Sequence, residues 1–590
     1  MADTHGLLLE VAPREMTGPP VPGAPRRRTN RYLLGLPAAV LLGLLLAPTL
    51  WTVWLALRTD DGVGLGNFVA VVTDPEAVRA GANSLTWVVM AICLLGLGLG
   101  IALLSRRVER LWGVLLYVMV LPFGISLLVS GAAFRMIFDP TPEHGIASAA
   151  AERLTGSSPV WLGTGSIRFV LVSAFAWTWL GYVVSLFRAG LDAIPVDVIR
   201  TARAEGLSRL SRLRHLELPI LRPVTAIVVL TLIVAAARLF DLILIVTPGS
   251  SQDEVDVVAL RWWHMVTSSP DPGRPAALAV LLSVFVVGVA LVGMRGMRRP
   301  WAIPEYPADG EAAKHRYSGR LERSASWIVG FVVAVMWAFP LLVLAATAWH
   351  EPAQAGAGGW WRFEGLGAES FVEAANVGLW RSLFGTAVIA VLATALVLTA
   401  AVPAAYLLAW GGLPRWLGRS LVVLFVMLAV LPVQMYAGPL GDVVDTLGLG
   451  GSRIPLIFVH AAAGLPFAML VLRPAFASAP PDLAAAVVLG RTGQRAAFGS
   501  VWRRRRYRPA LVAVAVLEFV LVWNDFIVGF LISGPGSSPL TLLLWGEARQ
   551  FAASAGTVAA SAVVASLVPA VVLLTTWKRV IRGLTGGALR

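Results

Sequence analysis

Twelve continuous apolar runs recur along this chain, and most are long enough to cross a lipid bilayer as a helix. A spanning helix needs about 20 apolar residues, whereas a spanning strand needs about 10 of alternating polarity. Because only helices and closed barrels satisfy their backbone hydrogen bonds in lipid, the runs predict an all-α membrane protein. The expected spans are residues 33–57, 84–105, 111–137, 169–190, 220–246, 275–294, 326–348, 382–410, 420–441, 454–475, 509–532 and 556–577.

Basic residues are distributed unevenly between the loops. Most of the 48 Arg and Lys residues lie on the side of the N-terminus, while opposite loops carry acids such as Asp60, Asp61 and Asp253. Basic loops stay in the cytoplasm, so we expect a multi-pass protein of the cell (inner or plasma) membrane with both termini cytoplasmic. Membrane topology thus accounts for the formal net charge of +14, and no nucleic-acid partner is expected.

One pattern occurs twice in the chain. A basic loop with a glycine, Gly206 or Gly490, is followed at the same interval by an aspartate in an apolar run, Asp241 or Asp525. Six expected spans lie on each side of a polar stretch, so the two copies insert the same way up, as parallel six-helix repeats. The predicted layout is a disordered cytoplasmic tail (1–32), a first membrane domain (33–294), a cytoplasmic linker (295–325) and a second membrane domain with a cytoplasmic C-terminal tail (326–590).

Both repeats have a long basic loop ahead of the fifth span. In residues 191–223, leucines including Leu207 and Leu210 recur every three residues with arginines between them, which predicts an amphipathic helix along the membrane surface. Gly206 interrupts it as the elbow of a helix-turn-helix. The second loop, residues 480–509, contains an Ala-rich helix, Gly490 and a run of arginines. Anchoring to anionic lipid accounts for the arginines but not for the repeated interval to an aspartate.

These loops resemble the EAA loops of binding-protein-dependent ABC import permeases, whose pattern is Glu-Ala-Ala-x-x-x-Gly. The chain resembles, more narrowly, a fusion of the two subunits of a maltose-type carbohydrate permease. Residues 64–68 and 240–242 are similar to the first subunit, and residues 523–526 and 582–588 to its partner. The motif glutamate is replaced by Arg200 in the first copy and by Ala484 in the second, and the second copy lacks the family's Leu-Pro.

The resemblance implies the type I ABC importer permease fold and two partners besides the bilayer. An ABC ATPase dimer is expected on the cytoplasmic side, and an extracellular or lipoprotein solute-binding protein on the other. The residues that the resemblance assigns to ATPase coupling are Arg200, Ala202, Gly206, Leu210, Ala484, Ala485, Ala486, Gly490, Arg582 and Thr585.

The chain lacks the residues for its own nucleotide chemistry. A P-loop needs Gly-Lys-Ser/Thr, but Lys314 follows Ala313 and Lys578 follows Trp577. ATP and Mg²⁺ are therefore expected on the partner ATPase, and no cofactor on this chain. With one cysteine and scattered histidines, no catalytic set and no metal site are expected.

Ionisable residues within spans are costly in lipid and are candidates for function. Arg238 and Asp241 are expected on one face of the fifth span, and Glu518 and Asp525 on one face of the eleventh. Holding the two halves together is the alternative role for the two aspartates, and packing is the alternative for the aromatic candidates. The proposed solute pathway comprises Trp177, Trp179, Tyr182, Asp241, Tyr436, Asn524 and Asp525.

The sequence therefore predicts the permease of an ATP-driven importer for a sugar or sugar-like solute, a transport component rather than an enzyme, working by alternating access. An ion-driven secondary carrier, with Asp241, Asp525 and Glu518 as ion sites, is one alternative. An ABC permease for a polyamine, thiamine or iron is the other. A carrier has no need of matched basic loops in its two halves.

Overall fold

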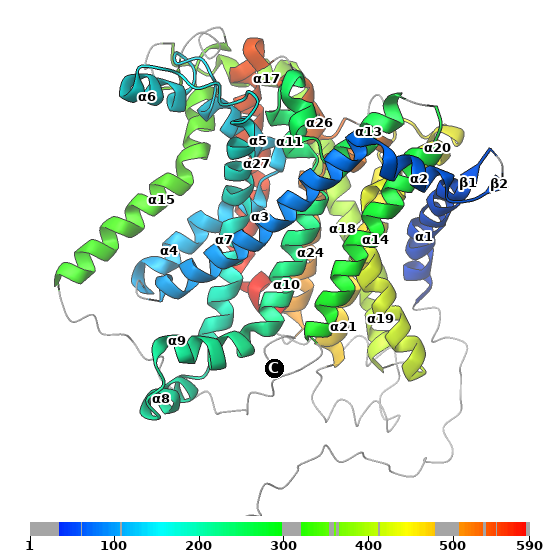
Figure 1. Cartoon of the computed structure of the whole chain (residues 1–590), viewed down its shortest axis with the longest axis horizontal. Coiled ribbons are helices and arrows are strands. Elements are labelled where there is room, and N and C mark those ends of the chain that lie inside the picture. Colours follow the sequence, from blue (N-terminus) through cyan, green and yellow to red (C-terminus); the bar gives the residue numbers. More distant parts are fainter. Residues whose placement is uncertain are drawn as a thin grey trace, which may run out of the picture.

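The computed structural model describes residues 35–60, 62–106, 109–268, 270–297, 320–352, 359–361, 365–410, 413–477, 507–534, 538–549 and 551–585. These residues form a bundle of helices (Figure 1). A short antiparallel hairpin, β1 (Arg58–Thr59) and β2 (Gly62–Val63), follows the first helix. The coupling residues Ala484, Ala485, Ala486 and Gly490 lie outside the described residues.

Within the described ranges, nine helices are long and apolar enough to cross a membrane, or ten with one bent pair. Every run expected from the sequence corresponds to a helix or to a broken helix, which confirms the all-α membrane fold. The unbroken spans are α1 (Leu36–Leu57), α3 (Pro75–Ser105), α7 (Ile167–Asp192), α14 (Gly273–Met297), α15 (Arg320–Ala348), α18 (Leu379–Trp410), α21 (Ile454–Ala477) and α27 (Phe551–Thr585).

The third and fifth spans of both halves are broken. The matched positions of the breaks are the structural signature of two copies of one unit. In the first half the pieces are α4 (Glu109–Val120), η2 (Leu121–Gly124) and α5 (Leu127–Ile137), then α10 (Leu218–Ala237) and α11 (Asp241–Val246). In the second half they are α19 (Arg415–Ala429), η5 (Val433–Met435) and α20 (Ala437–Thr446), then α24 (Arg508–Asn524) and α25 (Ile527–Ile532).

Proline accounts for the breaks in the third spans. Pro122 lies in η2, and the helix axis turns by 104° across this segment. Pro432 immediately precedes η5. A proline removes one backbone donor and clashes with the preceding turn, so these two residues kink the third spans.

The fifth spans break at the two aspartates, which corrects the expectation that each aspartate lies inside a continuous helix. Asp241 begins α11, after residues 238–240 leave the helix, and Asp525 follows the last residue of α24. Asp525 Oδ2 accepts hydrogen bonds from the N–H groups of Val528 (3.0 Å) and Gly529 (3.2 Å). These are free donors of the first turn of α25, so the carboxylate stabilises a new helix start. The pairs Arg238–Asp241 and Glu518–Asp525 therefore do not share a face of one helix.

The first span of each half packs against the other half. Thr52 Oγ1 on α1 donates to Met435 O (2.8 Å) in the second half. Trp177 Nε1 donates to Trp337 O on α15 (2.8 Å), and Trp337 Nε1 donates to Met119 O (3.1 Å). This exchange ties the two repeats into one body.

Short helices occupy the two ends of the bundle (Figure 1). One end carries α8 (Val196–Ala204), α9 (Arg209–Arg212) and the π-helix η3 (Leu213–Glu217), and we call it the elbow end. The opposite end carries α2 (Gly66–Thr73), α6 (Ile146–Thr155), η4 (Gly249–Ser251), α12 (Gln252–Val255), α13 (Val258–Ser268), α17 (Glu369–Asn376) and α26 (Leu540–Ala548).

Two of these short helices, α13 and α26, begin in the same way. The N–H of Val258 donates to Ser84 Oγ on α3 (3.0 Å), and the N–H of Leu540 donates to Thr386 Oγ1 on α18 (2.8 Å). A hydroxyl on the second span of each half therefore satisfies a free donor at the matching helix start. This correspondence places α13 and α26 as equivalents around the interface between the halves.

Glycine substitutions are expected to separate tight helix crossings from open ones. A Cβ on Gly181 would overlap the carbonyl of Met119, whereas a Cβ on Gly96 meets nothing within 4 Å. Gly181→Ala should destabilise the fold by about 1–3 kcal/mol through overpacking, and Gly96→Ala should not. Thermal unfolding of the purified variants measures this, and equal stability of the two would contradict the crossing. Gly98 also meets a neighbour, Val183, whereas Gly100 does not, so of Gly96, Gly98 and Gly100 on α3 it is Gly98 that marks a close contact.

Candidate functional site

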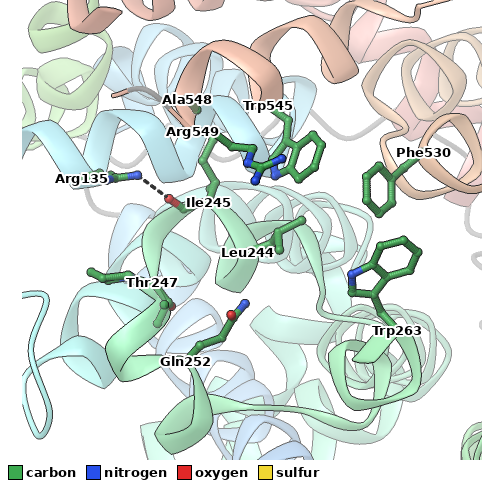
Figure 2. Close-up of a pocket in the computed structure, with 12 residues that line it drawn as sticks. Arg135, Leu244, Ile245, Thr247, Gln252, Trp263, Phe530, Trp545, Ala548 and Arg549 are labelled. Carbon is green, nitrogen blue, oxygen red and sulfur yellow. Dashed lines mark hydrogen bonds between the residues drawn. The ribbon is translucent and has the colours of Figure 1, made fainter. Parts of the chain in front are cut away.

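A cavity of about 530 Å³ lies between the two halves at the end opposite the elbow (Figure 2). The first half contributes α5, α11, η4, α12 and α13, and the second half contributes α25 and α26. The lining residues are Arg135, Leu244, Ile245, Thr247, Pro248, Gly249, Gln252, Trp263, Phe530, Trp545, Ala548 and Arg549.

Two arginines and three aromatic rings give this cavity its chemistry. Arg135 Nη1 donates to Ile245 O at the end of α11 (3.2 Å). The guanidinium of Arg549 lies 5.2 Å from the ring centre of Trp545, within cation–π range. Phe530 stands between Trp263 (4.6 Å between centroids) and Trp545 (4.8 Å). Rings and donors in this arrangement suit a ligand with an apolar face and polar edges.

An aromatic layer, Phe240, Phe526 and Phe530, adjoins the cavity, which Phe530 lines. Phe240 and Phe526 stack across the interface between the halves, with centroids 6.2 Å apart and an interplanar angle of 24°. Phe526 in turn stacks on Phe530 at 5.0 Å. Both Phe240 and Phe526 adjoin a helix break, so movement of α11 or α25 changes this contact directly.

A polar cluster lies deeper in the bundle than the cavity, because α11 and α25 run outward from the two aspartates. His460 Nε2 lies 3.9 Å from Asp525 Oδ2. Electrostatic interactions connect Asp241 with Asp525 and Arg238, and Tyr436 with Glu518. The members of the polar cluster are Arg238, Asp241, Tyr436, His460, Glu518 and Asp525.

Glycine and helix ends make room for this cluster. The carboxylate of Glu518 on α24 occupies the space beside Gly464 on α21, where a Cβ would overlap it. Asn524, expected as a pathway residue, donates from Nδ2 to Gly124 O in η2 (2.8 Å), and so forms a hydrogen bond between the halves. The structure thus brings Asp241, Tyr436 and Asp525 together. Sequence reasoning assigned no role in a pathway to Gln434, whose side chain is buried in η5 beside Tyr436.

The aromatic candidates on α7 lie outside the cavity lining. Trp177 is buried and forms the hydrogen bond to α15 described above. Tyr182 stacks on Phe123 of η2 at 4.6 Å, and Trp179 meets the same ring edge-on at 5.6 Å. Phe123 also contacts Trp577 of α27 at 6.1 Å. This group lies where α7, η2 and α27 meet, next to the break in the third span.

The expected elbow is present at the other end of the bundle. Helix α8 ends at Ala204, and Gly206, two residues further on, has a φ of +79°, the left-handed conformation that glycine favours. The N–H of Leu207 donates to Ala202 O (3.1 Å), and Ser208 Oγ accepts from the N–H of Ser211 (3.2 Å) to start α9. Residues 196–217 are called the elbow below.

The expected coupling residues differ in exposure. Leu210 is 75% exposed, an apolar side chain at the outer face of the elbow. Arg200 is also exposed and pairs with Asp197 at 3.4 Å. Ala202, by contrast, is buried, and its carbonyl accepts the hydrogen bond from Leu207 in the loop after α8. Arg582 is exposed on the last turns of α27, where its Nε donates to Lys578 O (3.1 Å), and Thr585 is the last residue of that helix.

Buried ion pairs join the elbow to the membrane spans. Glu217, 4% exposed, lies 3.5 Å from Arg106 and 3.5 Å from Arg212. Arg106 Nη2 also donates to Leu191 O at the end of α7 (2.7 Å). We call Arg106, Arg212 and Glu217 the Glu217 clamp. Through it the elbow is joined to the end of α3 and the end of α7.

Relatives of about half this length match the chain. The permease protein GgtC for osmoprotective compounds, from Synechocystis sp., is 28% identical over 261 residues, which are 42% of this chain and 92% of GgtC. The trehalose/maltose permease protein MalF of Thermococcus litoralis is 28% identical over 280 residues, 45% of this chain and 92% of MalF. The sn-glycerol-3-phosphate permease protein UgpA of Yersinia pseudotuberculosis is 26% identical over 281 residues, 45% of this chain and 94% of UgpA.

Among solved structures, a bacterial alginate ABC transporter in complex with its alginate-bound periplasmic protein is similar at 16% identity, with a TM-score of 0.41. The match covers 45% of this chain and 93% of that one. The family described as binding-protein-dependent transport system inner membrane component matches residues 84–300, which contain α7, the elbow, α11 and the first-half wall of the cavity. Over these residues, the chain is similar to that family of inner-membrane transport components.

Proposed function

We propose that this chain combines both permease domains of an ATP-driven, binding-protein-dependent importer for a sugar or sugar-like solute. The solute class is supported by its relatives, which include a trehalose/maltose permease protein. The observation that carries the proposal is the elbow, a rigid projection with an exposed Leu210, joined to α3 and α7 by the Glu217 clamp. The elbow end is then cytoplasmic, together with both termini.

The two ends of the bundle take different partners in this proposal. An ABC ATPase dimer, which binds ATP and Mg²⁺, docks on the elbow and on the corresponding second loop. A solute-binding protein delivers its ligand to the opposite end, where the cavity opens between α13 and α26. The chain itself carries out transport and no covalent chemistry.

The geometry suggests how movement passes between these ends. Closure of the ATPase dimer displaces the elbow, and the Glu217 clamp carries α3 and α7 with it. Rotation of the halves separates Phe240 from Phe526, because these rings belong to opposite halves and adjoin helix breaks. The solute then passes from the cavity to the polar cluster, whose carboxylates and tyrosine can bind hydroxyl groups. Nucleotide shifts the balance between two arrangements of one body.

An ion-driven carrier is the second candidate, favoured by the carboxylates and histidine of the polar cluster. Uptake distinguishes the two. An importer requires the ATPase and ATP, whereas a carrier moves solute down an ion gradient with neither present. Solute uptake driven by a proton gradient in proteoliposomes that contain this chain alone would reject the importer.

Leu210→Arg is expected to reduce recovery of the ATPase with this chain by at least about tenfold, because an apolar contact at the centre of the docking surface is replaced by a charge. The measurement is co-purification of an ABC ATPase co-expressed with this chain. Leu154→Arg is the matched control, because Leu154 is 84% exposed on α6 at the opposite end. Equal recovery with both variants would contradict docking on the elbow.

A further inference from the structure

The charge of the residues that line the cavity between the halves constrains the class of solute more than the volume of the cavity does. Among the described residues that line it, the charged ones are Arg135 and Arg549, one from each half, and both are cationic. Glu547, on the same helix as Trp545, does not line the cavity. Burial raises its pKa above the usual value, and the charge of Glu373 raises it further. The charged side chains that line the cavity are therefore cationic.

We propose that the transported solute is an acidic sugar, with a carboxylate or phosphate group that is attracted to Arg549 while its ring lies against Trp545 or Trp263. A neutral sugar needs aromatic faces and hydroxyl partners but no cation. A guanidinium, by contrast, matches the planar oxygens of a carboxylate or phosphate and forms short, charge-assisted hydrogen bonds. This inference rests on the proposed function and narrows its solute class.

The positions of the two arginines fit this assignment. Arg135 is anchored on Ile245 O at the end of α11, so its charge is fixed beside the cavity. Arg549 reaches the cavity over the face of Trp545, as Figure 2 shows. The two residues belong to opposite halves, so both walls of the cavity contribute positive charge. About 530 Å³ is within the range of pockets that enclose small ligands.

Matched probes test the charge preference on the full chain in lipid nanodiscs. Glucose 6-phosphate and glucuronate share the ring of glucose but carry an anion, and calorimetric titration gives the affinity for each. We expect both acidic probes to bind at least about tenfold more tightly than glucose, with an advantage that shrinks as salt is added. Equal affinity for acidic and neutral probes, or no binding of either acidic probe, would overturn the proposal.

Variants at Arg549 assign the preference to this cavity. Arg549→Gln should lower the affinity for glucose 6-phosphate to the affinity for glucose measured on the same variant. Arg549→Lys should recover part of the preference for acidic probes, since lysine keeps the positive charge but cannot form the paired hydrogen bonds of a guanidinium. Arg153→Gln, at an exposed arginine on α6, is the control and should change neither. A preference that survives Arg549→Gln would place the anion elsewhere and refute this site.

ATPase recovery tests the importer assignment, and the preference for acidic probes tests this inference, so either can fail without the other. If wild-type chain recovers the ATPase through Leu210 but shows no preference for acidic probes, the importer stands and the acidic solute is rejected. If it prefers acidic probes but recovers no ATPase, the charged cavity stands and the importer is rejected.

Discussion

Glu217→Gln is expected to lower the free energy of unfolding by about 2–3 kcal/mol and to abolish ATP-driven uptake. The substitution leaves the guanidinium groups of Arg106 and Arg212 without their carboxylate in a buried setting. Removing one partner of a buried pair costs about 3–5 kcal/mol, and the cost is smaller here because Arg106 remains in part exposed. Thermal unfolding reports the first effect, and uptake by proteoliposomes that contain the ATPase and binding protein reports the second.

The matched control lies in the same elbow. Glu205 is exposed at the end of α8, so Glu205→Gln should match the wild-type chain in both measurements. A double variant, Glu217→Gln with Arg212→Gln, should regain part of the lost stability, because one unpaired charge is removed with its partner. It should not regain uptake, because the link from the elbow to α3 and α7 stays broken. If Glu217→Gln behaves as Glu205→Gln does, the clamp does not transmit the movement.

The spans could be predicted from the sequence because the bilayer imposes one requirement on each of them. A continuous apolar run of sufficient length must be a helix, whatever packs against it. The elbow was predictable for a similar reason, since a glycine between amphipathic segments specifies a turn locally. The kinks at Pro122 and Pro432 also follow from local chemistry.

The breaks at Asp241 and Asp525 were not predicted, because a helix that restarts within a continuous apolar run produces no change in hydropathy. The signal was an aspartate just ahead of a short apolar stretch, which is a typical N-terminal capping pattern. The polar cluster depends on contacts between residues far apart in the chain, such as the hydrogen bond from Asn524 to Gly124. Nothing local specifies such contacts. Glu217 was passed over for the same reason, since its partner Arg106 ends a distant span.

Variants of Asp525 distinguish two roles that the sequence left open for this residue, holding the halves together and contacting the solute. Asp525→Ala is expected to destabilise the fold by about 2–4 kcal/mol, because the N–H groups of Val528 and Gly529 lose their acceptor inside the bundle. Helix α25 then loosens and Phe526 no longer stacks firmly on Phe240. Solute should therefore leak through proteoliposomes without ATP. Thermal unfolding and passive efflux of labelled solute measure the two effects.

Asp525→Asn removes the negative charge but keeps an oxygen that can accept the hydrogen bonds at the start of α25. The amide oxygen of asparagine can still accept from the N–H groups of Val528 and Gly529, so stability and the barrier to passive efflux should be close to wild type. If the carboxylate also binds the solute, uptake by Asp525→Asn falls while stability is retained. If it only starts α25, uptake is retained as well. Asp445→Ala, at an exposed residue of α20, controls for the loss of an acid in the second half. Equal stability of Asp525→Ala and Asp445→Ala would show that α25 does not depend on this cap, and the aromatic layer would then need another support.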